Sequence, residues 1–204
     1  MIKFVIVLLL LAGCTLAPKK NTPMAVYDLS MQQSIEPNSS PSINASILVA
    51  NVTAPIWLDN HEIHYRLAYH DPSRSYTYAN SRWVASPAKM FTQRIKGYLA
   101  TRTQKGIVSN HDALKADYAL HIELAEFTQV FDHLENSRVI VRMRASLIDR
   151  SARQMIAQRE FASEQNTATA DAAGAVKALI SASDTVLNEL LQWLNANLLE
   201  KHSA

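Results

Sequence analysis

Over its central part, the hydrophobic residues of this chain alternate with polar ones. One alternating stretch covers residues 63–69, a turn follows at residues 71–73, and a second stretch with aromatic side chains covers residues 76–83. Because successive side chains of a strand point to opposite faces, this pattern predicts a β-hairpin with one buried face. The aromatic side chains predict either sheet core or the lining of an apolar groove, and they are Tyr65, Tyr69, Tyr76, Tyr78 and Trp83.

Further strands are predicted on both sides of this hairpin. Residues 47–52 form a short apolar run, which is typical of a strand buried on both faces. Residues 118–125 and 139–148 alternate clearly, and residues 155–161 alternate more weakly. The links between these three segments are short, which favours an antiparallel meander. Residues 107–108 predict one more short strand.

Two segments show the three- and four-residue spacing of amphipathic helices. The first begins at Ser86-Pro87, an N-cap serine with proline at the first helical position, and Lys105-Gly106 ends it. The second covers residues 168–199, and Gly174 is a candidate break within it. The order of elements predicts an α+β fold: a single, largely antiparallel sheet with two main amphipathic helices packed on one face.

The first residues of the chain have the pattern of an export signal. Lys3 precedes an apolar run over residues 4–11 that is too short to cross a bilayer. The run leads into Leu11-Ala12-Gly13-Cys14, which resembles the bacterial lipobox, where the cysteine thiol is acylated, for example with palmitate, and the chain is cut just before it. We expect residues 1–13 to be a lipoprotein signal peptide. The alternative, Cys14 as a buried thiol, is disfavoured because the polar residues after it cannot bury it.

The residues after Cys14 are rich in Pro, Ser, Asn and Gln, and they predict a flexible tether over residues 14–44. One island in this segment, Val26-Tyr27-Asp28-Leu29, predicts a short edge strand docked on the domain. We expect the folded domain over residues 45–200. Thr15 stands where an aspartate would signal retention in the inner membrane of enterobacteria, which by analogy favours anchoring in the outer membrane, facing the periplasm.

The composition excludes several classes of function. The 204 residues carry 20 Lys and Arg against 18 Asp and Glu, and this near-neutral balance is poorly suited to nucleic-acid binding. A single cysteine excludes an internal disulfide framework and a Cys-rich zinc site. The sequence contains no G-x-x-x-x-G-K-[ST] loop, no G-x-S-x-G elbow and no H-E-x-x-H motif. We therefore expect no enzyme, no metal and no cofactor.

Two groups of polar residues are candidates for chemistry. His61 and His64, with Asp59, are the nearest approach to a metal site, but residues three apart on a strand point to opposite faces. The pairs at residues 111–112 and 132–133 lie in predicted loops with no nucleophile near them in sequence, which leaves only a triad assembled in space.

Three arginines lie on or beside one predicted strand, at positions 138, 142 and 144. Arg142 and Arg144 share a face of that strand. One interpretation is contact with lipid phosphates or with an acidic partner. The other, which we favour, is the solvated face of an antiparallel sheet.

The run over residues 76–87, with Ser81-Arg82-Trp83 at its core, resembles the ABC-type transport auxiliary lipoprotein family. That family also has a lipobox, a Tyr-x-Leu element in the tether, here Tyr27-Asp28-Leu29, and a helix after the Trp-containing run. The resemblance extends roughly over residues 26–199. Lys89 stands where an acidic residue would complete a capping box, a departure without functional weight.

The resemblance implies a non-catalytic accessory role in a lipid transport system built around an MCE (mammalian cell entry) domain protein and an inner-membrane ABC transporter or permease. The lipoprotein would receive or dock this path at the outer membrane, held there by its lipid anchor. The alternative is an envelope assembly or structural lipoprotein with another outer-membrane or cell-wall partner. A homo-oligomer is left open. The candidate partner-binding residues are Tyr76, Tyr78, Arg82 and Trp83, of which Arg82 and Trp83 could instead define the fold.

Overall fold

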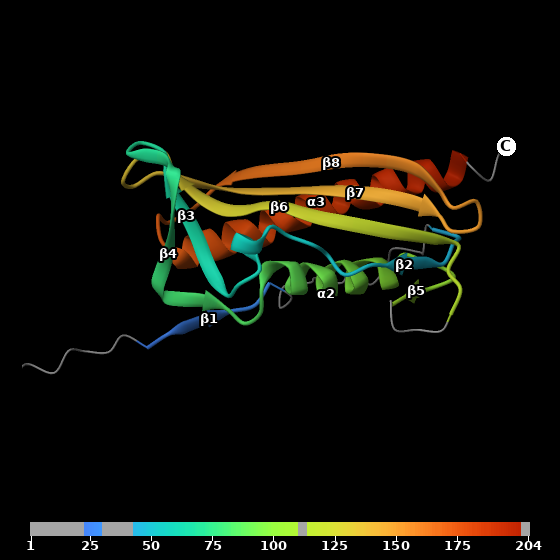
Figure 1. The fold of residues 1–204 in the computed structure, drawn as a ribbon. Coiled ribbons are helices and arrows are strands. Elements are labelled where there is room, and N and C mark those ends of the chain that lie inside the picture. The colour runs from blue at the N-terminus through green and yellow to red at the C-terminus, as the bar shows by residue number, and fades with distance from the viewer. Residues whose placement is uncertain (1–22, 30–42, 110–113, 201–204) are drawn as a thin grey trace, which may run out of the picture.

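One mixed sheet of eight strands, with two helices against it, organises the computed structural model, which describes residues 23–29, 43–109 and 114–200 (Figure 1). The strands are β1 (Ala25–Tyr27), β2 (Ile47–Val49), β3 (Glu62–Leu67), β4 (Asp71–Trp83), β5 (Ile107–Val108), β6 (Tyr118–Phe131), β7 (Ser137–Asp149) and β8 (Gln154–Asn166). The helices are α2 (Pro87–Ala100) and α3 (Ala172–Glu200), and a short 3₁₀ helix, η1, covers Ile56–Leu58.

Strand β6 lies at the centre of this sheet. One of its edges pairs with β7 along nearly the whole strand, and β8 continues the sheet beyond β7. The other edge is shared, because β2 pairs with the start of β6 and β3 pairs with its end. The sheet therefore divides at β6 into a β2–β5 branch and a β3–β4–β1 branch, which lie toward opposite ends of the molecule (Figure 1).

The predicted α+β class and the meander are confirmed. The pairs β3–β4, β6–β7 and β7–β8 are antiparallel. The shorter pairs β1–β4, β2–β5, β2–β6 and β3–β6 are parallel, which the sequence pattern did not indicate. The long pairs dominate, so the sheet is mostly antiparallel.

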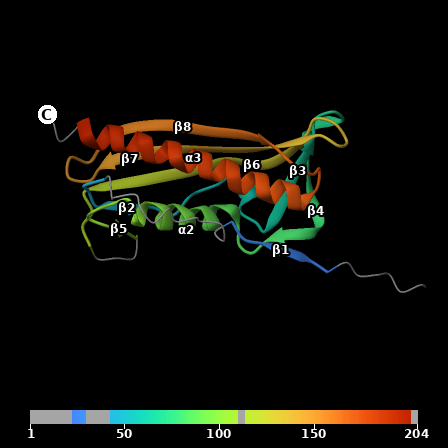
Figure 2. The ribbon, with the colours of Figure 1, turned by 180° about the vertical axis from the view of Figure 1, so that it is seen from behind.

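The helices lie on one side of the sheet, the side turned to the viewer in Figure 2. Alternate residues of β7 are fully buried on that side under α3, and they are Val139, Val141, Met143, Ala145 and Leu147. Aromatic side chains extend this core toward α2, where Phe91 meets Phe127 edge to face at 5.5 Å between ring centroids. Removing these side chains from water is the main source of stability for such a fold.

The two helix starts follow local rules. Pro87 occupies the first turn of α2 after Ser86, as predicted. Asp171 caps α3, because its Oδ1 accepts a hydrogen bond from the backbone N–H of Gly174 at 2.8 Å. The expected break at Gly174 is wrong: this glycine belongs to the first turn of α3, and a Cβ there would lie 2.1 Å from the Thr169 carbonyl oxygen.

The turn of the β3–β4 hairpin lies earlier than predicted. The chain reverses at residues 68–70, and Asp71-Pro72-Ser73 already belong to β4. Between Arg66 and Leu67 the register shifts, and β4 carries extra residues there. The shift has a physical reason, since proline has no N–H to donate to the ladder and is accommodated at bulges.

The predicted island at residues 26–29 does dock on the domain. Strand β1 pairs in parallel with the end of β4, so that Tyr27 lies opposite Trp83. The Tyr27 carbonyl accepts a hydrogen bond from the N–H of Val84 at 2.8 Å, and Leu29 is fully buried. The folded unit thus includes residues that precede position 45.

Candidate functional site

Three tyrosines of the β3–β4 hairpin gather at the end of β6, and we call Tyr65, Tyr76 and Tyr78 the tyrosine cluster. The rings of Tyr65 and Tyr76 stack at 5.3 Å between centroids, and Tyr78 lies 4.8 Å from Tyr65. Phe131 closes the cluster with an edge contact to Tyr65. All three tyrosines are half-buried, so the cluster combines a packed interior with accessible ring surface. Tyr69 lies apart in the exposed hairpin turn.

A chain of hydrogen bonds that passes through the buried Gln129 fixes the tyrosine cluster to the sheet. The Tyr78 hydroxyl donates to Gln129 Oε1 at 2.6 Å, and Gln129 Nε2 donates to Ser137 Oγ at 2.8 Å. Ser137 Oγ lies 2.6 Å from Thr167 Oγ1, which joins β7 to the segment before α3. Burial, and then the charge of Asp171, raise the pKa of Tyr78 above its ordinary value, so the hydroxyl stays protonated as a donor.

Arg82 and Trp83 are neighbours in sequence with opposite environments. Trp83 is 1% exposed and packs in the core, with its ring centroid 5.5 Å from that of Phe127. Arg82 is exposed and lies in register with Val26 of β1 and Glu62 of β3. Among the predicted partner-binding residues, Trp83 thus contributes to the fold, and Arg82 is accessible together with parts of Tyr76 and Tyr78.

The arginines of β7 are engaged by carboxylates on the sheet face away from the helices. Arg144 lies 3.7 Å from Glu123 and 3.9 Å from Glu160, across both neighbouring strands. Arg142 makes corresponding pairs with Glu126 and Glu160 at 3.9 and 3.8 Å. Arg138 pairs with Asp132 and, at 3.0 Å, with Glu164. We call these pairs the charged ladder; it favours the interpretation as a solvated sheet face over a phosphate site.

Among the described residues, His61 and His64 do not belong to a group of three potential metal ligands. His64 is buried, its ring meets Trp57 edge to face at 5.5 Å, and its Nε2 lies 3.3 Å from Asn60 Oδ1. Burial lowers the pKa of His64, which favours the neutral ring. Within residues 23–29, 43–109 and 114–200, no group of three His, Cys, Asp or Glu side chains is placed to hold a metal. Asp132 is held by Arg138, and the pair at residues 111–112 lies outside the described residues.

One structurally important residue was missed by sequence reasoning. Arg94 in α2 is 1% exposed and donates hydrogen bonds to the Leu29 carbonyl and, at 2.5 Å, to Asp184 of α3. This side chain therefore links the segment after β1 to both helices. Its position three residues after Phe91, on the buried side of α2, was the available signal.

The predicted anchor, Cys14, lies outside the described residues, as does the signal segment before it. Among the helices of the described ranges, none is long and apolar enough to cross a membrane.

The chain resembles known proteins in sequence and in structure. The model of a family described as the ABC-type transport auxiliary lipoprotein component matches residues 27–190. No curated protein matches the sequence significantly. A crystal structure from Xanthomonas campestris, assigned to family DUF330, is similar with a TM-score of 0.70 and 17% identity, covering 90% of this chain and 97% of the other. A hypothetical protein from Chlamydia trachomatis is similar with a TM-score of 0.52 and 12% identity, covering 76% and 98%. At these identities the structures support the fold alone.

Proposed function

The chain belongs to the ABC-type transport auxiliary lipoprotein family, and on that premise we propose that it serves an MCE-type lipid transport system as a non-catalytic accessory component. The family match over residues 27–190 is the observation that carries this proposal, since it makes the chain an auxiliary lipoprotein component of an ABC-type transport system. An MCE-domain protein and the inner-membrane transporter would be its partners.

The proposed anchor is Cys14. The apolar run before it and the Leu11-Ala12-Gly13-Cys14 motif support acylation at this position. Two or three acyl chains give stable membrane attachment, because each buried methylene contributes about 0.8 kcal/mol. Thr15 supports placement in the outer membrane, with the domain in the periplasm.

The proposed docking surface consists of Arg82 and the accessible ring faces of Tyr76 and Tyr78. Aromatic and arginine side chains are the types that contribute most to protein interfaces. The hydrogen bond from Tyr78 to the buried Gln129 and the core packing of Trp83 would hold this surface rigid, which lowers the entropic cost of docking.

Site-specific photo-crosslinking in intact cells tests the proposal. A photoreactive residue at position 82 or 76 should capture an MCE-domain protein, identified by mass spectrometry. The same residue at position 159, an exposed arginine of β8 outside the docking surface, is the matched control and should not capture it.

Other outcomes of this experiment are equally informative. Capture of a different outer-membrane or cell-wall protein from positions 76 and 82 would replace the proposal with the envelope-assembly role. Fractionation of the same cells tests the anchor, because Cys14→Ala should remove the chain from the outer-membrane fraction. Retention of that variant in the outer membrane would contradict lipidation at Cys14.

A further inference from the structure

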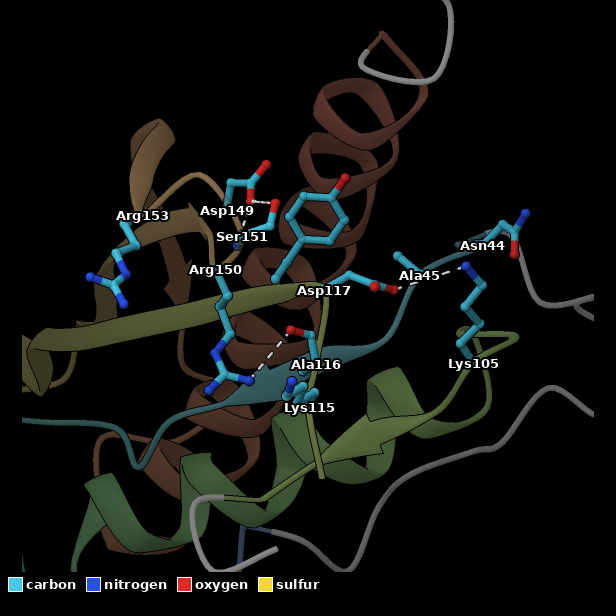
Figure 3. Close-up of a pocket in the computed structure, with 11 residues that line it drawn as sticks. Asn44, Ala45, Lys105, Lys115, Ala116, Asp117, Asp149, Arg150, Ser151 and Arg153 are labelled. Atoms are coloured by element: carbon cyan, nitrogen blue, oxygen red, sulfur yellow. Dashed lines mark hydrogen bonds and ion pairs between the residues drawn. The ribbon is translucent and has the colours of Figure 1, made fainter. Parts of the chain in front are cut away.

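A polar cleft of about 700 Å³ opens at the start of β6, the end of that strand opposite the tyrosine cluster (Figure 3). Its walls come from the segment before β2, the α2–β5 loop, the residues before β6 and the β7–β8 turn. Among the described residues, six charged side chains line it, and they are Lys105, Lys115, Asp117, Asp149, Arg150 and Arg153.

The two carboxylates of the cleft serve the fold. Asp117 Oδ2 accepts hydrogen bonds from the N–H and the hydroxyl of Ser46 at 3.0 and 2.9 Å, with Lys105 Nζ at 4.0 Å. Asp149 Oδ1 accepts three bonds from the β7–β8 turn, two of them from Ser151 at 2.6 and 2.8 Å. The acids therefore hold their own loops in place.

Three cations of the cleft contrast with the charged ladder, where each arginine of β7 faces a carboxylate. Lys115, Arg150 and Arg153 have no ion pair with any carboxylate of the described residues. Arg150 donates one long hydrogen bond, 3.4 Å, to the Ala116 carbonyl. Their guanidinium and ammonium donors are therefore available to an anionic ligand.

The backbone of Arg153 adds an independent observation. Its φ is +54°, in the left-handed region that glycine adopts at no steric cost and that side chains disfavour. The β7–β8 turn thus carries an arginine at a position where glycine would adopt the same backbone conformation without steric strain. Figure 3 shows Arg150 and Arg153 extending on the same side of the cleft, with Lys105 on the other side beside Asp117. A non-glycine residue held in this region is a reason to look for a role of its side chain.

We propose that this cleft binds a phosphate group through Lys115, Arg150 and Arg153. Arginine matches the oxygens of a phosphate with paired N–H donors, and lysine adds a compact charge. The mostly polar lining suits a headgroup and not an acyl chain. The group could belong to a soluble phosphate ester or to a phospholipid headgroup. Binding to the isolated protein requires no MCE partner, so this inference is independent of the proposed transport role.

NMR titration of the full-length lipoprotein in a sugar-headed, phosphate-free detergent tests the cleft. Glycerol 3-phosphate is the soluble probe, dihexanoyl phosphatidylglycerol is the lipid probe, and glycerol is the uncharged control. Saturable shifts at residues 115, 150 and 153, weakened by added salt, are the expected result. Binding of both phosphate probes would assign the site to the phosphate group itself, and binding of the lipid probe alone would assign it to a phospholipid. If neither phosphate probe changes the chemical shifts of these residues, the proposal is overturned.

A matched pair of variants separates binding from folding. Arg153→Gly removes the cation and relieves the left-handed backbone, so it should weaken phosphate binding about tenfold while the melting temperature stays the same or rises. Arg159→Gln removes an exposed arginine of β8 outside the cleft and should leave binding unchanged. Equal weakening by the two variants would show nonspecific attraction and overturn the site.

Discussion

The two faces of β7 differ in what their side chains do, although the residues alternate along one strand. On the helix side, Val139, Val141, Met143, Ala145 and Leu147 are fully buried. On the open side, Arg142 and Arg144 lie about half exposed in the charged ladder. Burial stabilises in proportion to apolar area removed from water, whereas exposed ion pairs contribute little. The stability of the domain should therefore depend on one face, which leaves the other face free to vary.

The largest expected effect contrasts Trp83 with Arg82. Trp83→Ala leaves a cavity beside Phe127 and should lower the free energy of unfolding by about 3–5 kcal/mol. Arg82→Ala removes an exposed side chain and should change it by less than about 0.5 kcal/mol. Urea unfolding of both variants measures the difference. A comparable loss of unfolding free energy in the two variants would contradict the view that only the buried face of β4 stabilises the domain.

His64 is an exception to the contrast between a buried and an exposed face. It lies two residues after the exposed Glu62 on β3, on the same face of the strand, and yet it is buried. Its lowered pKa means that the unfolded chain takes up a proton first as the pH falls. The contribution of His64 to stability should therefore be complete above pH 6.5, its ordinary pKa, and be lost as the pH falls below that value. Urea midpoints measured from pH 7.5 to 5 should show this slope.

Two variants check the origin of that slope. His64→Gln should flatten it, since the buried imidazole at position 64 is then removed. His133→Gln, in the exposed β6–β7 turn, should leave it unchanged. An unaltered slope in His64→Gln would assign the pH dependence to other groups.

A small effect that depends on salt is expected in the charged ladder. Arg144→Gln breaks its pairs with Glu123 and Glu160, all three side chains being about half exposed. The loss should be below about 1 kcal/mol and should vanish at about 1 M salt, where the Debye length is near 3 Å. Arg144→Lys keeps the charge and is the control. A larger loss of unfolding free energy that does not depend on salt would mean that the charged ladder contributes as much to stability as buried apolar side chains do.

The sequence pattern predicted the elements better than their extents or partners. Alternation predicts a strand over residues 118–125, whereas β6 continues to Phe131. A bulge between Leu124 and Glu126 changes the phase, so that Phe127 returns to the core one residue later than a period of two requires. Strand β8 continues past residue 161 to Asn166, and the alternation is weak because β8 is an edge strand with mostly polar, exposed side chains.

Contacts between distant segments could not be predicted from local pattern. The parallel pairing of β1 with β4 joins residues more than fifty positions apart, and nothing in three residues of strand specifies that partner. Likewise the cleft combines residues near positions 44, 105, 117 and 151, each of which is an ordinary loop residue in its own segment. Pairing and packing in the folded chain decide such neighbours.

The docking of β1 also determines how far from the membrane the domain can work. A tether of about thirty residues, from Cys14 to Asn44, could span about 100 Å when extended. Because β1 is paired with β4 and Leu29 is buried, only the residues between Cys14 and Pro23 separate the proposed anchor from the fold, and they span at most about 30 Å. If Cys14 is acylated as proposed, the β1 end of the sheet therefore stays within about 30 Å of the bilayer surface, and the domain faces a partner from a nearly fixed distance.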